Sequence, residues 1–148
     1  MGDIFSYLTQ GQRSLKNAKQ ILAVSYPLTS DPKLFASVVD RLYNCWINGI
    51  HVLCLHEGLT KDLNAEIGFF REDFSQKVPL PRQWMRTFDA IVATRNARAE
   101  SPVEFRRKQT FVICSPAFRA RRLDLSRVQQ YLQDTERFVK LVEEKVRQ

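Results

Sequence analysis

The fold is decided by residues 33–57, KLFASVVDRLYNCWINGIHVLCLHE. Apolar side chains recur at helical spacing through this whole stretch and cover a broad face rather than a narrow stripe. The residues that form this face are Leu34, Val38, Leu42, Cys45, Trp46, Gly49, Val52, Leu53 and Leu55. A face of that breadth predicts a central helix that other elements contact on several sides.

Both ends of this predicted helix carry the expected signals. Asp31 stands immediately before Pro32, so an aspartate cap is followed by a proline at the first helical position. Gly58 follows the last apolar residues and suits a C-terminal cap. The helix is therefore predicted to lie between these two positions.

Four further segments are predicted as helices: residues 4–24, about 63–74, 81–98 and 126–146. The first should end at the Tyr26-Pro27 pair, because the residue before a proline is pushed out of the α region. The last should begin at Ser126, which forms a capping-box pattern with Gln129. Five helices with short connections predict an all-α bundle that forms one domain over residues 1–148.

The least regular part of the chain is residues 101–124. Residues 103–108 are mostly polar and basic, whereas residues 111–114, FVIC, are an apolar run rich in strand-forming types. We expect this run to be a short extended segment that lies over the bundle before the last helix. The sequence alone leaves open whether it is strand or coil.

The composition is that of an ordinary globular protein, with 44% hydrophobic and 26% charged residues. Three widely spaced cysteines without a CxxC pair do not resemble a disulfide framework or a zinc site. The N-terminus lacks the pattern of a signal peptide, and no apolar run approaches the length of a membrane span. We therefore expect a cytoplasmic protein that does not enter a membrane.

Residues 82–127 carry all of the net charge. This window holds eleven basic and four acidic side chains, and eleven minus four equals the +7 of the whole chain. Ten of the eleven are arginines, whose planar guanidinium suits bidentate binding of phosphate or carboxylate. Clustered arginine therefore predicts a polyanionic partner.

Arg95 has a special place in this cluster. It continues the spacing of Trp84, Phe88 and Ile91, which are expected to face the core. An arginine at the edge of a core needs an acidic partner or a bound anion. Asp40 is one carboxylate that could pair with it, in which case Arg95 only ties two helices together.

Arg95 and Asn96, near the end of the penultimate long helix, are followed by a loop, an extended segment and a last helix. In these features the chain resembles the HEPN superfamily. The resemblance implies a helical bundle that dimerises, with an arginine and a histidine that meet across the dimer interface. In nuclease members of that family these two residues cleave RNA without a metal and leave a cyclic phosphate; arginine stabilises the phosphorane and histidine moves a proton.

The chain departs from the family pattern where the histidine should fall. Glu100, Ser101 and Pro102 occupy those positions. We therefore expect a non-catalytic or degenerate HEPN-like domain that binds RNA or another phosphate-bearing ligand. The expected contact residues are Arg95, Arg98, Arg106, Arg107 and Lys108, extended by Arg119, Arg121 and Arg122.

Two alternatives stay open. In one, the arginines bind an acidic protein partner or close a homodimer, and no nucleic acid is involved. In the other, the protein is a metal-independent ribonuclease whose candidate catalytic residues are Arg95, Asn96 and Glu100, with a distant histidine as a further possibility. Replacing Arg95 with Ala distinguishes these readings. Loss of cleavage with retained folding would indicate the ribonuclease, and loss of RNA binding alone would indicate the binding module. Gross destabilisation would indicate that Arg95 only ties two helices together.

No cofactor or metal is predicted. The sequence contains no GxGxxG, P-loop, GxSxG or HExxH motif. His51 and His56 are five positions apart and do not share a helix face, as an i, i+4 metal pair would. Among the aromatic residues that interleave the basic region, Phe105 and Phe118 are the candidates for stacking on nucleic-acid bases.

Overall fold

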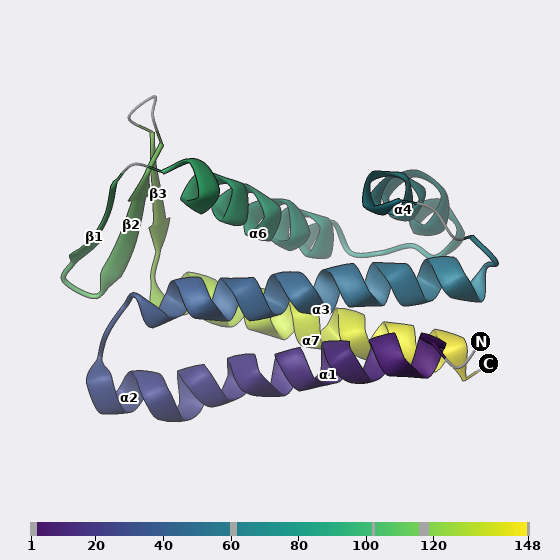
Figure 1. The fold of residues 1–148 in the computed structure, drawn as a ribbon, viewed down its shortest axis with the longest axis horizontal. Helices are drawn as coiled ribbons and strands as arrows, with labels where there is room; N and C mark the ends of the chain where they lie inside the picture. The colour runs from purple at the N-terminus through teal and green to yellow at the C-terminus, as the bar shows by residue number, and fades with distance from the viewer. Residues whose placement is uncertain (1–2, 60–61, 102, 116–118, 148) are drawn as a thin grey trace.

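The structure is a computed structural model that describes residues 3–59, 62–101, 103–115 and 119–147. Three long helices lie side by side along the molecule: α1 (Asp3–Gln20), α3 (Leu34–His56) and α7 (Leu125–Val146). A fourth, α6 (Arg82–Glu100), packs on α3 and α7 (Figure 1). The shorter α4 (Leu63–Phe69) lies at one end of the bundle and a small sheet at the other. The predicted helical bundle is confirmed.

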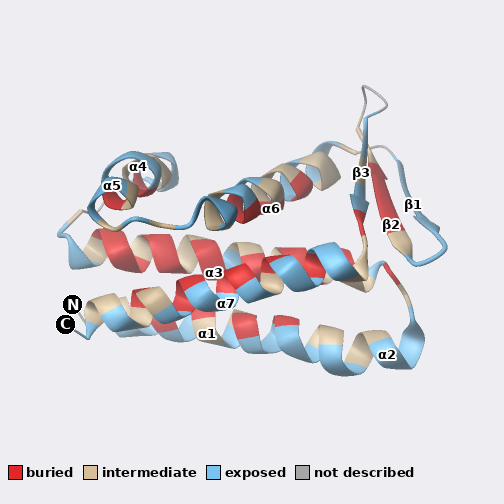
Figure 2. Ribbon diagram, turned by 180° about the vertical axis from the view of Figure 1, so that it is seen from behind, coloured by how far each residue is buried: buried red, intermediate tan, exposed pale blue. Residues whose placement is uncertain are grey.

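The central position predicted for residues 33–57 is also confirmed. Helix α3 contacts α1, α4, α6 and α7, and its buried residues cover more than one side (Figure 2). The helix begins two residues later than predicted, at Leu34, and Asp31 accepts a hydrogen bond from the Lys33 amide over 3.0 Å in the turn that leads into it. Gly58 has φ +76°, the left-handed conformation of a glycine that follows a helix.

An aromatic cluster lies where α3, α6 and α7 meet. Trp46 is fully buried, and its ring stacks on that of Phe138 with 4.0 Å between centroids. Phe70 and Phe88 complete the cluster around it. The indole Nε1–H donates to the Thr135 hydroxyl over 2.8 Å, so the one polar atom of this side chain is satisfied inside the core.

Gly49 allows α3 and α7 to approach closely. A Cβ atom at this position would stand 2.6 Å from Cε2 of Phe138, a distance that real Cβ atoms do not reach. A side chain at position 49 would displace the Phe138 ring and so disturb its stacking on Trp46, which lies one turn earlier in α3.

The first helix runs further than predicted. After α1 the chain continues through a π-helical turn, η1 (Ile21–Ser25), into α2 (Tyr26–Thr29), and Ser30 ends it with φ 52°. The prediction that Tyr26-Pro27 ends the helix is wrong. Proline lacks an amide hydrogen and its ring clashes with the carbonyl four residues earlier, and the wider π turn just before Pro27 relieves both problems.

The predicted helix near residues 63–74 is present in three pieces. Helix α4 continues into a π turn, η2 (Phe70–Phe74), and a last turn, α5 (Ser75–Lys77). Asp62 caps α4 by accepting a hydrogen bond from the Ala65 amide over 2.8 Å. Helix α6 then begins directly after Pro81, as predicted.

Residues 103–107, 110–114 and 120–123 form a three-stranded antiparallel sheet, which the sequence analysis did not predict. Strand β2 (Thr110–Cys114) lies between β1 (Val103–Arg107) and β3 (Ala120–Leu123). The apolar run 111–114 is therefore the central strand of a sheet, not an isolated segment. The sheet was missed because its two outer strands are short and largely basic, and every residue of β1 is exposed.

The last helix is capped by a different residue from the one predicted. The Asp124 carboxylate accepts a hydrogen bond from the Arg127 amide over 2.8 Å, and Ser126 lies inside the first turn of α7. Both residues are good capping types, and the end of β3 places Asp124 in the extended conformation that a cap requires. No helix in the described parts of the chain is long and apolar enough to cross a membrane.

Candidate functional site

The sheet sorts the basic residues of the chain onto two faces. In an antiparallel sheet, residues opposite each other point to the same side, and so do residues two apart on one strand. The inner face, which is turned to the helices, consists of Glu104, Arg106, Phe111, Ile113, Arg121 and Leu123. The outer face consists of Val103, Phe105, Arg107, Thr110, Val112, Cys114, Ala120 and Arg122.

The arginines of the inner face bind other parts of the protein. Arg121 donates from Nε to the Thr94 hydroxyl over 2.8 Å and from a terminal nitrogen to the Ala90 carbonyl oxygen over 3.3 Å. Arg106 lies 3.5 Å from the Asp31 carboxylate. These two side chains attach β1 and β3 to α6 and to the start of α3, so they are only partly available to a ligand.

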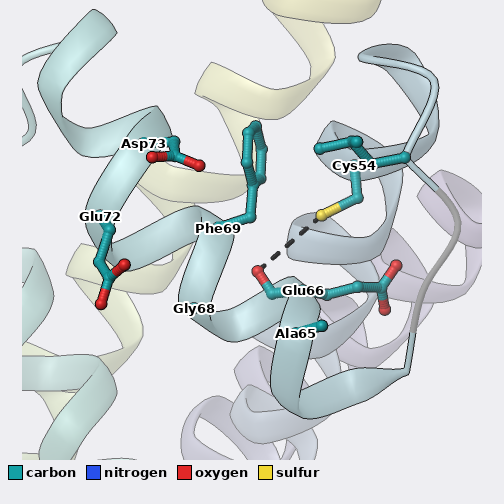
Figure 3. Close-up of a pocket in the computed structure, with 8 residues that line it drawn as sticks. Cys54, Ala65, Glu66, Gly68, Phe69, Glu72 and Asp73 are labelled. Atoms are coloured by element: carbon teal, nitrogen blue, oxygen red, sulfur yellow. Dashed lines mark hydrogen bonds between the residues drawn. The ribbon is translucent and has the colours of Figure 1, made fainter.

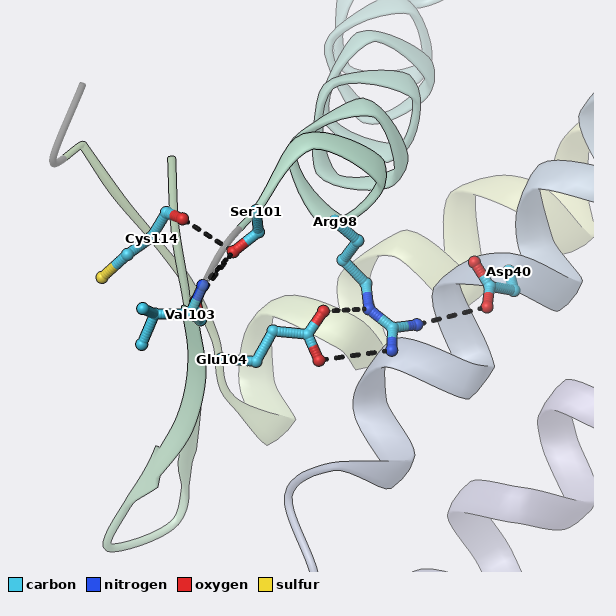
Figure 4. Close-up of polar contacts among 6 residues, drawn as sticks. All are labelled: Asp40, Arg98, Ser101, Val103, Glu104 and Cys114. Atoms are coloured by element: carbon cyan, nitrogen blue, oxygen red, sulfur yellow. Dashed lines mark hydrogen bonds and ion pairs between the residues drawn. The ribbon is translucent and has the colours of Figure 1, made fainter. Parts of the chain in front are cut away.

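Arg98 joins the last turn of α6 to both the sheet and α3. Its Nε lies 3.0 Å from the Glu104 carboxylate, and its Nη1 lies 3.4 Å from that of Asp40 (Figure 4). Arg98 therefore holds the carboxylate that the sequence analysis assigned to Arg95. Its role in the structure is to position β1 beside the helices.

Ser101 fixes the same corner of the sheet. Its hydroxyl oxygen lies 2.6 Å from the Cys114 carbonyl oxygen and accepts a hydrogen bond from the Val103 amide over 3.2 Å (Figure 4). Ser101 thus holds together the ends of β1 and β2. Arg98 and Ser101 thus add to the contacts through which Arg106 and Arg121 attach the sheet to the helices.

The outer face carries cations that form no ion pair with the described residues of the bundle. Arg107, Lys108 and Arg122 are exposed, and in the described residues none of them lies within ion-pair distance of a carboxylate. Together with Thr110 and Val112 they line a hollow of about 320 Å³. Lys108 has φ 56°, a conformation that belongs to the turn between β1 and β2. No described carboxylate therefore neutralises the positive charge of this surface.

A second hollow lies on the other side of β1 and differs in charge. It is lined by Asp31, Lys33, Glu104, Phe105, Arg106 and Phe111 and encloses about 350 Å³. Two acids and two bases face it, and Asp31 and Arg106 pair with each other. A polyanion gains little from such a balanced site, so the outer face is the better candidate.

Arg95 does not point into the core. It is exposed, and its guanidinium lies over the ring of Tyr43 with 4.0 Å to the centroid. The inward prediction was wrong because Thr94, not Arg95, fills the buried position at this level of α6. Arg119, at the start of β3, is exposed as well.

The candidate catalytic residues do not form a site within one chain. Asn96 and Glu100 are exposed, and Glu100 is five residues from Arg95, so the two lie about 140° apart around α6. His51 is eight residues beyond Tyr43 on α3, about 12 Å along the helix from the place where Arg95 lies. Neither Glu100 nor His51 is therefore placed to give a proton to, or take one from, a group bound at Arg95.

His51 pairs instead with a buried carboxylate. Its Nδ1 lies 2.6 Å from Oε2 of Glu66, which is only 5% exposed. Tyr7 packs edge-on against the imidazole, with 4.4 Å between ring centroids. The pair joins α3 to α4, and Tyr7 adds α1 to the contact. The sequence analysis did not single out Glu66, because a lone glutamate in a polar segment gives no signal of burial.

We expect the Glu66→Ala variant to be less stable by about 1–3 kcal/mol, because the partly buried imidazole would lose its acceptor. Urea unfolding followed by circular dichroism measures this free energy. Glu72→Ala is the matched control: Glu72 is exposed, and its loss should change stability by less than about 0.5 kcal/mol. Equal stability of the two variants would contradict a structural role for the His51–Glu66 pair.

A further hollow beside this pair is acidic. It encloses about 300 Å³, and Cys54, Glu66, Glu72 and Asp73 are among the residues that line it (Figure 3). Burial raises the pKa of the Cys54 thiol to about 12, so the sulfur stays protonated at neutral pH and is a poor nucleophile. The acidic residues at this hollow also repel a polyanion. In the described residues, no group of three or more His, Cys, Asp or Glu side chains is placed to hold a metal ion.

The structure therefore divides the predicted contact residues. Arg107 and Arg122 share the outer face, and Lys108, in the adjoining turn, lines the same hollow. Arg98, Arg106 and Arg121 bind the protein itself, and Arg95 lies on Tyr43. Phe105 is on the outer face, whereas Phe118 lies outside the described residues. Thr110 and Val112, which line the basic hollow, were not predicted. The alternation of side chains over residues 103–107 is the signal that could have indicated this face.

Comparisons of the chain with models of known protein families, with curated proteins and with solved structures found no match. The resemblance to the HEPN superfamily therefore stays a prediction, and so does the homodimer that it implies.

Proposed function

We propose that this protein binds RNA, and that the outer face of the sheet is the surface that contacts the phosphate backbone. One observation carries the proposal: Arg107, Lys108 and Arg122 meet around one hollow, and no described carboxylate neutralises them. Cations that a fold leaves unpaired on one face repel one another in the free protein. A bound polyanion removes that repulsion.

The kinds of residue also favour phosphate as the bound group. Arg107 and Arg122 present planar guanidinium groups that can donate two parallel hydrogen bonds to one phosphate. The Thr110 hydroxyl lies beside them in the same hollow and supplies a further donor. The surface thus combines charge with directional hydrogen bonding, which a merely solvated basic face does not need.

The proposal assigns binding rather than cleavage to the protein. The residues that would cleave RNA in the HEPN pattern are dispersed within this chain, and the sheet face contains no histidine. Arg95 is exposed above Tyr43 on the helices and is not among the residues that line the basic hollow, so the proposal does not depend on it.

Salt should weaken RNA binding steeply. Three phosphate contacts on a single strand give a slope of about −2 for log affinity against log salt concentration, which is a loss of about 20-fold between 50 and 200 mM salt. Fluorescence anisotropy of labelled poly(U) measures the slope, and Arg122→Ala should make it shallower by about 0.7. Affinity that stays constant over this range would contradict the proposal.

A further inference from the structure

Phe105 is the more exposed of the two aromatic side chains in the strands. It lies on the outer face two residues from Arg107, and it lines the neighbouring charge-balanced hollow rather than the basic one. Its side chain is 43% exposed, and that of Val103, two residues earlier on the same face, is 50% exposed. In the sheet register Phe105 lies opposite Val112, which in turn lies opposite Arg122. Arg107 is two residues further along the strand. A flat apolar surface is thus bordered by positive charge.

Strand geometry places these groups at a short range from one another. Neighbouring strands are about 4.8 Å apart, so Arg122 begins about 10 Å from Phe105 across the sheet. Two residues along a strand span about 7 Å, which is the separation between Phe105 and Arg107. Both guanidinium groups can therefore reach the backbone of a ligand whose apolar part rests on the Phe105 ring.

Phe105 is exposed because it stands on the edge strand of the sheet. Val112, in the same row, is only 4% exposed because large side chains stand on both sides of it, whereas Phe105 belongs to the edge strand and has an open side. An exposed ring beside unpaired cations is suited to a ligand that is both flat and anionic. A nucleotide has both properties, since every base has a π-face and every unit carries a phosphate.

We propose that the ligand is a single-stranded nucleic acid, with one base stacked on Phe105 while Arg107, Lys108 and Arg122 hold the adjoining phosphates. This inference rests on the proposed function and narrows its ligand class. A duplex is excluded because its bases are already stacked on one another and offer no free face. An acidic protein segment would satisfy the charges equally well, but it would not require an exposed ring two residues from Arg107.

The experiment compares three probes of similar charge: poly(U), a single strand of abasic sugar phosphates, and an RNA duplex. Phe105→Ala should weaken poly(U) binding by on the order of 5- to 150-fold, the range expected for loss of one stacked base. It should leave the salt slope and the affinity for the abasic strand unchanged. Phe105→Trp should retain poly(U) affinity. Phe5→Ala, which removes a ring that is 61% exposed on α1, is the matched control and should bind like wild type.

The outcomes separate this inference from the proposed function. If Phe105→Ala binds poly(U) like wild type while affinity still falls with salt, base stacking is wrong and RNA binding stands. If wild type prefers the duplex, the single-strand assignment is overturned. If wild type binds none of the probes at 50 mM salt, the proposed function and this inference both fail, and a protein partner becomes the better assignment. Circular dichroism of each variant checks that the fold is retained.

Discussion

Replacing Arg107, Lys108 and Arg122 together with Glu should lower the affinity for single-stranded RNA by at least about 100-fold in 0.1 M salt. Each phosphate contact on a single strand contributes about 0.7 log units at this concentration, so three contacts contribute about two. Glutamates at the same positions would also repel the phosphates. The variant should fold normally, because all three side chains are exposed and none forms an ion pair with a described carboxylate.

The matched control for this variant reverses three cations on the helices. Arg13, Lys16 and Lys140 are exposed on α1 and α7, and their replacement with Glu changes the net charge by the same six units, from +7 to +1. The long-range electrostatic attraction between protein and poly(U) should fall equally in both variants. The difference between their poly(U) affinities therefore measures the direct contacts of the outer face. Equal losses of poly(U) affinity would show that net charge governs binding and would contradict the assignment of this surface.

Replacing Trp46 with Ala should destabilise the protein by about 3–5 kcal/mol. The side chain is fully buried and lies at the junction of α3, α6 and α7, where it stacks on Phe138. Its removal would leave a cavity and would also leave the Thr135 hydroxyl without the indole N–H that it accepts. A loss of this size is a large part of the total stability of an ordinary domain.

Urea unfolding followed by circular dichroism measures this loss, with Trp84→Ala as the control. Trp84 lies on α6 and is only half-buried, so its replacement should cost clearly less than that of Trp46. Trp46→Phe should recover most of the stability, because it keeps an aromatic ring on Phe138 and loses mainly the hydrogen bond. Equal effects of the two Trp→Ala variants would contradict the central position of the aromatic cluster.

The helices could be predicted because their signals are local. The apolar spacing of residues 33–57 is read within a few turns, and the structure confirms the helix, which begins at Leu34, just after the Asp31-Pro32 signal. The errors arose where distant contacts or a rarer geometry decide the outcome. A π turn carries the first helix past Pro27, and pairing with two basic strands turns residues 111–114 into the centre of a sheet.

The sequence by itself determined the bundle, the central helix and the concentration of arginine in residues 82–127. Only the tertiary structure decided which arginines are available to a ligand. Arg98, Arg106 and Arg121 bind partners far away in the chain, whereas Arg107 and Arg122 share an open face with Phe105, and Lys108 lies in the adjoining turn. The physical reason is strand alternation combined with register: adjacent residues point to opposite sides of a sheet, and pairing with distant strands decides which side meets the core.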